Sequence, residues 1–134
     1  MLGEVIAEAK GRRTGRRVMD GPGGGQRIEV SFEDSGTILG IEANNIGTYW
    51  AQVKPDGTIY GEGQGINVTK DGDMVSWRGA GTGVFRGGGA VGYRGSIHYT
   101  TSSPKLARLN SIAGVFEFEV DAAGNTHGKI WEWK

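Results

Sequence analysis

Apolar and polar residues alternate along much of the chain. Within residues 26–33, the apolar residues Ile28, Val30 and Phe32 are separated by single polar or charged residues. A period of two is typical of a half-buried antiparallel strand, and related patterns predict strands along the rest of the chain. These predicted strands are Gly3–Lys10, Gln26–Glu33, Thr37–Ile41, Thr48–Val53, Thr58–Val68, Met74–Ala80, Val84–Thr100 with a glycine break, Gly114–Asp121 and His127–Lys134.

Short polar segments separate these predicted strands. Pro55-Asp56-Gly57, Lys70–Asp73 and Asp121–Asn125 carry the residue types that tight turns need. Gly and Asn tolerate a positive φ, and Pro presets φ near about −65°. A total of about eight strands, spaced roughly 8 to 14 residues apart, is the signature of an all-β sandwich or barrel.

Glycine favours one of these two architectures. Thirteen of the 39 residues from Gly57 to Gly95 are glycine, inside segments that otherwise look like strands. Strand glycines mark bulges, tight bends or close backbone approach, and a small barrel uses such kinks where its strands coil sharply. The sequence therefore predicts an all-β fold in which residues 1–134 form one domain, an eight-stranded antiparallel β-barrel. A β-sandwich is the alternative.

One segment departs from the strand pattern. Ser103 and Pro104 have the residue types of a helix N-cap and first helical position. Leu106, Leu109 and Ile112 follow three residues apart, which places them on one face. The segment predicts a single short helix or 3-10 turn that lies across one end of the sheet and closes the core there.

The composition narrows the classes of function. The chain has 15 Lys and Arg against 15 Asp and Glu, a formal net charge of zero, no Cys and two His. These counts exclude a globally basic nucleic-acid-binding protein, disulfides, thiolate metal sites and a cysteine nucleophile. A dedicated transition-metal site is not expected either, because such sites usually need three or more nitrogen or sulfur ligands. The sequence contains no signal for a cofactor.

A basic cluster near the start of the chain is the one local charge asymmetry. It consists of Lys10, Arg12, Arg13, Arg16 and Arg17. No aromatic residue interleaves these cations, so the stacking part of single-strand recognition is missing. We interpret the cluster as a solvated hairpin tip between the first two strands and expect no nucleic-acid partner. No secretion signal or membrane span is apparent, so a cytoplasmic location without a membrane partner is expected.

The order of motifs from Gly47 to Asp121 resembles that of a known group of barrels. The motifs are GTYW, PDGTIYGEGQG, WRGAGTGVFRGGGAVGYRGSIHY and LARLNSIAGVFEFEVDAAG. They resemble the small bacterial relatives of the allene oxide cyclase and dirigent barrels. The resemblance implies an eight-stranded barrel of lipocalin-like shape with an interior cavity, assembly into dimers or trimers, and a cyclase or isomerase activity without a cofactor.

The segment Thr58–Val68 carries the first candidate site. Its alternation places Tyr60, Glu62 and Gln64 on one face and Gly61, Gly63 and Gly65 on the other. Two interpretations are open. Either the polar face lines a cavity, or it is solvated and the glycines make room for bulky core groups.

The segment Gly92–Thr100 carries the second candidate site. Arg94 and His98 lie on the face opposite Tyr93 and Tyr99. Arginine pairs bidentately with anions and histidine titrates near neutrality, so the two can recognise an anionic ligand; the alternative is a solvent-facing row. The candidate catalytic residues are Glu62, Arg94 and His98, and the candidate ligand-binding residues are Trp50, Tyr60, Gln64, Trp77, Tyr93 and Tyr99.

Two further strands carry large side chains. Phe116 and Phe118 alternate with Glu117 and Glu119, which predicts core phenylalanines and surface glutamates; the alternative is a buried carboxylate acting as an acid or base. Trp131 and Trp133 share a face of the last strand, which is typical of packing at a barrel mouth or a subunit interface.

Two functions agree with these patterns. The first is a barrel that binds a small hydrophobic or amphipathic molecule in its interior, with the cyclase or isomerase activity that the resemblance implies. The second is a non-catalytic, filled barrel that acts as a structural or protein-interaction homo-oligomer. The two functions are distinguished by whether Tyr60, Glu62 and Gln64 point inward. An inward Glu62 with space around it supports the first function, and an inward row of aromatic and aliphatic residues supports the second.

Overall fold

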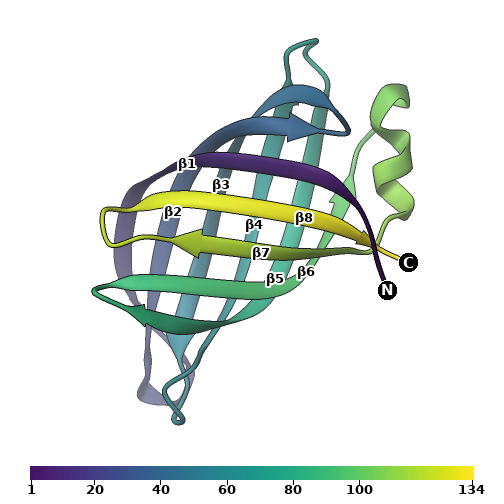
Figure 1. Cartoon of the computed structure of the whole chain (residues 1–134). Coiled ribbons are helices and arrows are strands. Elements are labelled where there is room, and N and C mark those ends of the chain that lie inside the picture. Colours follow the sequence, from purple (N-terminus) through teal and green to yellow (C-terminus); the bar gives the residue numbers. More distant parts are fainter.

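The computed structural model describes residues 1–134, and most of them lie in antiparallel strands (Figure 1). The chain forms eight strands and two short 3-10 segments. In order, they are β1 (Leu2–Asp20), η1 (Pro22–Gly24), β2 (Gln26–Ile38), β3 (Ile41–Val53), β4 (Ile59–Thr69), β5 (Met74–Gly87), β6 (Ala90–Thr100), η2 (Pro104–Ser111), β7 (Gly114–Val120) and β8 (Asn125–Trp133).

The strands close into a barrel. Each strand pairs with the next in sequence order, and β8 returns to pair with β1. The closing pair places Ala7 opposite Ile130 and Lys10 opposite His127. The predicted eight-stranded antiparallel barrel is therefore confirmed, and the sandwich alternative is wrong.

Glycines permit the strands to approach one another closely on the inner face. A Cβ atom added to Gly36 of β2 would lie 1.9 Å from the Glu8 carbonyl oxygen of β1. One added to Gly95 of β6 would lie 2.0 Å from the Ala80 carbonyl oxygen of β5. Any side chain at these positions would overlap the neighbouring backbone, so these are the close approaches that the glycine content predicts.

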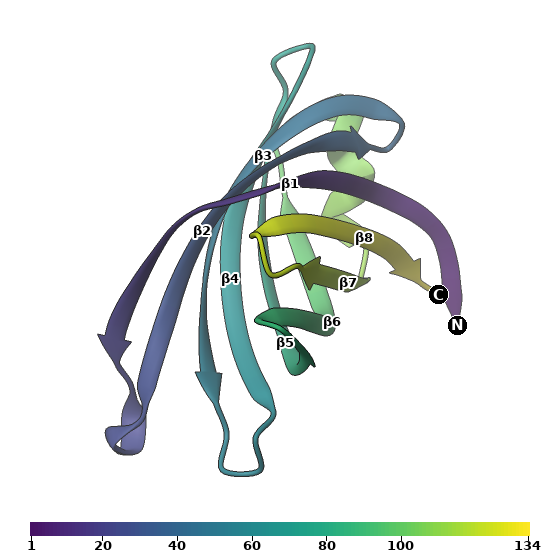
Figure 2. The ribbon, with the colours of Figure 1, turned by 60° about the vertical axis from the view of Figure 1, so that its left-hand side comes forward.

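The first two strands are longer than the sequence predicts. The basic cluster belongs to β1, which has a bulge between Arg13 and Gly15, and the turn to β2 lies at residues 21–25. The interpretation of the cluster as a hairpin tip is therefore wrong. Residues 14–20 project beyond the barrel and are exposed on both faces, so this part of the strand has no apolar alternation to reveal it (Figure 2). The segment Thr37–Ile41, which the sequence predicts as a separate strand, is instead the hairpin between β2 and β3.

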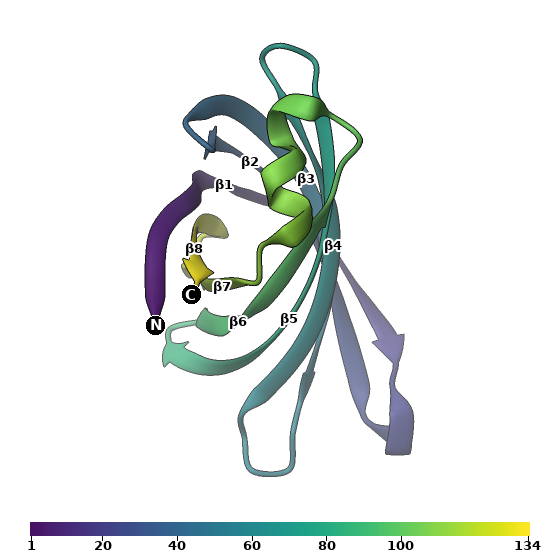
Figure 3. The same cartoon turned by 90° about the vertical axis from the view of Figure 1, so that its right-hand side faces the viewer.

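The segment η2 lies across one end of the barrel, as predicted (Figure 3). Leu106 and Leu109 are 0% exposed and pack in one apolar cluster with Ile38, Val75 and Ile97, among others. Ser103 occupies the N-cap position and its side chain makes no cap hydrogen bond. Both chain termini lie at this end (Figure 1), where the Lys134 amide donates to the Met1 carbonyl oxygen at 2.8 Å. Neither 3-10 segment is both long and apolar enough to cross a lipid bilayer.

The alternation in β7 separates apolar side chains inside the barrel from charged side chains outside it. Phe116 and Phe118 face the interior, whereas Glu117 pairs with Arg94 and Glu119 pairs with Arg86 at 3.2 Å outside. Core phenylalanines and surface glutamates are therefore confirmed. The same alternation in β8 directs Ile130 inward and the two tryptophans, Trp131 and Trp133, outward.

Candidate functional site

The interior of the barrel contains a cavity of about 130 Å³. It lies between the aliphatic cluster under η2 and a cluster of aromatic rings nearer the opposite end. The apolar part of its wall comes from Phe32, Trp77, Tyr93, Ile97, Phe116 and Phe118. Such a wall offers dispersion contacts and apolar area to a small ligand, but no hydrogen bonds except at a few polar positions.

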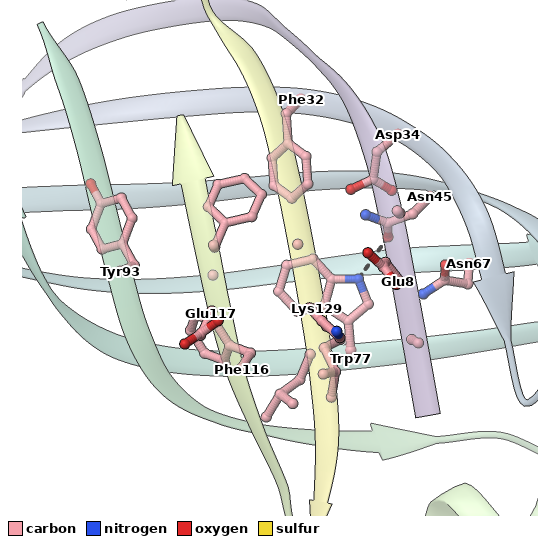
Figure 4. A pocket seen from close by; sticks show the side chains of 18 of the residues that line it. Glu8, Phe32, Asp34, Asn45, Asn67, Trp77, Tyr93, Phe116, Glu117 and Lys129 are labelled. Atoms are coloured by element: carbon pink, nitrogen blue, oxygen red, sulfur yellow. Dashed lines mark hydrogen bonds between the residues drawn. The ribbon is translucent and has the colours of Figure 1, made fainter. Parts of the chain in front are cut away.

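Three polar side chains form a row on one wall of this cavity. Asp34 on β2 lies directly opposite Asn45 on β3, which lies directly opposite Asn67 on β4. All three border the cavity, and Asn45 is only 8% exposed. The strand register alone brings these residues together, because 33 positions separate the first from the last. The cavity therefore has one polar wall in an otherwise apolar surface (Figure 4).

A tryptophan on the same inner face, two strands away from Asn45, reaches this polar row. The Trp77 Nε1–H on β5 donates a hydrogen bond of 2.7 Å to Asn45 Oδ1 (Figure 4). The indole can cross β4 and β3 because the positions below it are glycines. A Cβ atom on Gly65 would lie 2.4 Å from Trp77 Nε1, and one on Gly47 would lie 2.8 Å from Trp77 Cζ2. These glycines are therefore required by the ring that they accommodate.

Burial alters the acidity of Asp34. Removal from water raises the pKa of this carboxyl to about 6, although a hydrogen bond from the Asn45 side chain partly opposes the shift. Asn45 thus accepts from the Trp77 indole and lies directly opposite Asp34 on the neighbouring strand. A carboxyl with a pKa near neutrality can both accept and return a proton at physiological pH.

Tyr99 contributes a hydroxyl that has no partner. The residue lies on β6, is 5% exposed, and its Oη makes no hydrogen bond. Burial, and in second place the charge of Asp34, raises its pKa above the ordinary value. An unpaired buried hydroxyl is unusual, because leaving one unsatisfied costs about 1–3 kcal/mol. Two other buried hydroxyls are unpaired, those of Ser103 and Thr126.

Aromatic rings close the cavity on the side away from η2. The ring centroids of Phe32 and Phe118 are 5.0 Å apart, and those of Tyr49 and Tyr93 are 5.6 Å apart in an edge-to-face arrangement. Burial raises the pKa of both tyrosines, that of Tyr93 to about 12. A ligand entering from that end must pass between these rings.

Four of the nine sequence-predicted site residues border the cavity, and three of them, Trp77, Tyr93 and Tyr99, belong to its inner face. The fourth, Glu62, directs its side chain outward, where it accepts from the Tyr60 hydroxyl. Including Glu62, six of the nine have side chains on the outer surface; these are Trp50, Tyr60, Glu62, Gln64, Arg94 and His98. The prediction that this second group faces a ligand in the interior is wrong.

Contacts on the outer surface involve several of these six residues. The Arg27 guanidinium lies 3.7 Å from the centroid of the Trp50 ring, and Tyr60 stacks edge-on against Trp50 with centroids 5.7 Å apart. The Tyr60 hydroxyl donates to Glu62 at 2.8 Å. On β4 the inward positions are the alternate glycines, so the interpretation in which those glycines make room for core groups is the correct one.

Carboxylates on neighbouring strands also border the cavity but direct their charges outward. Figure 4 labels Glu8, Glu117 and Lys129 near the cavity. Glu8 interacts with His127 Nε2 at 2.8 Å, and its side chain is 43% exposed. No group of three or more His, Cys, Asp or Glu side chains is placed to hold a metal ion. The chemistry of the interior therefore depends on Asp34, the two asparagines and Tyr99.

Sequence reasoning missed Asp34, Asn45 and Asn67. One signal was available for Asp34, because it continues the period of two that begins with Ile28, Val30 and Phe32. The predicted strand stopped one residue earlier, at Glu33. Asn45 and Asn67 offered no such signal, since an asparagine in a strand is ordinarily interpreted as a solvated position.

Comparisons with known proteins identify the fold. No protein family model matches the chain, and no curated protein matches it. A conserved protein of unknown function from Rhodopseudomonas palustris is 15% identical, with a TM-score of 0.82 over 98% of this chain and 97% of that one. A beta-barrel like protein from Acinetobacter baumannii is 14% identical, with a TM-score of 0.82 over 100% and 96% of the two chains.

A third solved structure is that of an enzyme from Penicillium herquei. It is 15% identical, with a TM-score of 0.66 over 96% of this chain and 92% of that one. The chain has the fold of small bacterial β-barrel proteins. At these identities the similarity concerns the fold alone, and membership of the allene oxide cyclase or dirigent groups stays a prediction.

Proposed function

We propose that this barrel binds a small amphipathic molecule in its interior, against the polar row on β2, β3 and β4. The observation that carries the proposal is the cavity itself, whose largely apolar wall also contains the buried carboxyl of Asp34 and the amides of Asn45 and Asn67. A barrel filled only for stability would gain by replacing this carboxyl with an apolar side chain, because burial penalises its ionised form. A ligand that pairs with these polar groups supplies a reason to retain them.

The size of the cavity specifies the class of ligand. At about 130 Å³ it is slightly smaller than the engineered apolar cavities of about 150 Å³ that bind benzene. The ligand class is therefore a single small ring, whose polar substituent would lie at the polar row on β2, β3 and β4. Fused rings or long chains require the aromatic cluster of Phe32, Tyr49, Tyr93 and Phe118 to open.

Cyclohexanol and cyclohexanone are suitable probes. Trp77 is the tryptophan inside the barrel, whereas Trp50, Trp131 and Trp133 face outward, so the indole N–H signals in a ¹H–¹⁵N NMR spectrum contain their own controls. Titration with either probe is expected to shift the Trp77 signal, assigned with Trp77→Phe, and to leave the other three unchanged. Cyclododecanol, which exceeds the cavity, is expected to produce no shift. Equal shifts of all four signals, or none at saturation, would contradict the proposal.

A second function rests on a separate observation, the exposed apolar surface at the chain termini. Leu2 pairs with Trp133 and Val5 pairs with Trp131 on the joined edges of β1 and β8, and Leu2 and Trp133 are 57% and 62% exposed. Contiguous exposed apolar residues mark interaction sites. We propose that a second copy of the chain covers this surface.

Light scattering after size exclusion tests this second function. It is expected to give a dimer or trimer, and the Trp133→Ser substitution is expected to weaken that assembly. A monomer at all concentrations would refute the proposal that a second copy covers the surface.

A further inference from the structure

The cavity combines one inward-facing carboxyl with a wall of aromatic rings. Resting on the proposed binding function, we infer that its ligand is a small organic cation, a primary ammonium group carried on one apolar ring. The Asp34 carboxylate pairs with the ammonium group, and the aromatic side chains contact the ring. The inference names the chemical class of the amphipathic ligand and the residue that selects it.

Asp34 lies on the inner face of β2 and is accessible from the cavity. It continues the face of Val30 and Phe32, which are buried, whereas the intervening Glu33 is exposed on the outer face. Asp34 borders the cavity and keeps part of its surface accessible, and Figure 4 shows its side chain beside that of Asn45. A ligand in the cavity can therefore contact this carboxyl directly.

No positive charge inside the barrel compensates this carboxyl. Five charged residues border the cavity, and all except Asp34 direct their charges toward the outer surface. These four are Glu8, Glu62, Glu117 and Lys129, which contact His127, Tyr60, Arg94 and Trp131, respectively. Asp34 takes part in none of the ion pairs of the protein. A carboxylate removed from water without a counterion is costly, so a cationic ligand supplies the charge that the interior lacks.

The wall beside Asp34 suits a cation in two further respects. The ring centroids of Phe32 and Trp77 are 6.3 Å apart on this wall, and the faces of aromatic rings attract cations more strongly when water is excluded. The polar row also supplies acceptors, since Asn45 Oδ1 accepts one hydrogen bond from Trp77 and an amide oxygen can accept two. An ammonium group has three donors and a hydroxyl has one. The row of carboxyl and amide oxygens therefore favours the ammonium.

The test compares three ligands that carry the same ring: cyclohexylamine, cyclohexanol and cyclohexanecarboxylate. Titration of the Trp77 indole signal at pH 8 gives their dissociation constants. Cyclohexylamine is expected to bind about 10-fold to 100-fold more tightly than cyclohexanol, the range for a hydrogen bond to a charged group. Cyclohexanecarboxylate is expected not to bind, because its charge has the same sign as that of Asp34.

Asp34→Asn is expected to remove the preference for the amine. The variant keeps the shape of the side chain and an oxygen acceptor but has no charge. Its affinity for cyclohexylamine should therefore fall by about 10-fold to 100-fold, while its affinity for cyclohexanol should be nearly unchanged. Glu33→Gln removes a carboxylate from the outer face of the same strand, so this matched control should keep the preference.

The preference should also depend on pH. Burial raises the pKa of Asp34 to about 6, so about a tenth of this carboxyl is ionised at pH 5 and nearly all of it at pH 8. Because the cation binds the ionised form, the affinity for cyclohexylamine should rise about 10-fold between these pH values. The affinity for cyclohexanol should not rise, and neither should that of Asp34→Asn for the amine.

The other groups that face the interior keep their charge states in this range. Three tyrosines line the cavity with raised pKa values, so they stay protonated; they are Tyr49, Tyr93 and Tyr99. From β1, Arg13 lies near Tyr49, and an arginine stays charged at every pH used. The pair of Glu8 with His127 lies on the outer surface. A pH dependence that Asp34→Asn abolishes is therefore due to Asp34.

The outcomes separate this inference from the proposed binding function. If cyclohexanol shifts the Trp77 signal but cyclohexylamine binds no more tightly, or if Asp34→Asn keeps the preference for the amine, the inference is refuted and the binding function stands. If neither ligand shifts that signal, both are refuted. Circular dichroism confirms that each variant is folded, and retained cyclohexanol binding by Asp34→Asn shows that its cavity is intact.

Discussion

Replacement of Asp34 by Asn tests the chemistry of the interior through stability alone. The substitution preserves the shape of the side chain and its oxygen acceptor, and it removes the ability to ionise. In the folded protein, burial raises the pKa of Asp34 from 3.8 to about 6. Below pH 3.8 the folded and unfolded chains are both protonated at this residue, so ionisation carries no penalty.

The penalty develops as the pH rises. Between pH 3.8 and about 6 the unfolded chain releases the proton while the folded chain keeps it, so the free energy of unfolding falls with increasing pH. At about 1.4 kcal/mol for each pH unit, the difference between the two pKa values corresponds to about 3 kcal/mol once the pH exceeds 6. Asp34→Asn lacks this penalty. The variant should therefore match the wild type near pH 4 and exceed its stability by about 2–3 kcal/mol near pH 8.

Urea denaturation at these two pH values measures the effect, with Glu33→Gln as the control for loss of a carboxylate on the outer face of the same strand. A stability difference between Asp34→Asn and the wild type that is equal at both pH values, within about 0.5 kcal/mol, would refute the argument. It would show that water or an unrecognised cation reaches the carboxyl in the folded protein.

Three further substitutions test separate parts of the structure. Tyr99→Phe should raise the free energy of unfolding by about 1 kcal/mol, because it removes an unpaired buried hydroxyl; thermal denaturation showing a loss of that size would mean that the hydroxyl is satisfied. Gly65→Ala should displace the Trp77 indole and cost about 1–3 kcal/mol, whereas Gly15→Ala, which has open space around it, should be neutral by the same urea assay. Leu106→Ala should cost about 2–5 kcal/mol in chemical denaturation, since this side chain is 0% exposed under η2; a cost below about 1 kcal/mol would show that η2 does not seal the barrel.

Asp34 and the Tyr99 hydroxyl both lower the stability of the ligand-free barrel, one through an ionisation penalty and the other through an unpaired donor. Natural proteins commonly retain such destabilising groups where binding or catalysis requires them. Substitutions that stabilise the barrel while abolishing ligand binding would be the expected signature of a functional interior.

Local pattern predicted most of the architecture, with a β-sandwich left open as the alternative to a barrel. The alternation around Val30 and Phe32, the turn residues between strands and the glycine content predicted an antiparallel barrel, because strand formation and tight coiling depend on neighbours in the chain. The capping segment was equally visible, since Ser103-Pro104 and the three-residue spacing of Leu106 and Leu109 are local signals. The strand limits were less accurate where β1 extends into solvent on both faces.

The interior site was decided by tertiary structure. A period of two shows that two faces differ, but which of them points inward on β4 depends on whether neighbouring strands need glycine there. Gly65 and Gly47 leave the space that Trp77 occupies, and the indole then meets Asn45, 32 positions away in the chain. Barrel closure brings Asp34 and Tyr99 to one cavity from opposite walls. The sequence by itself determined an antiparallel all-β fold and favoured a closed sheet. The register between its strands decided which polar groups it would enclose, because hydrogen bonding across strands joins residues that no local pattern connects.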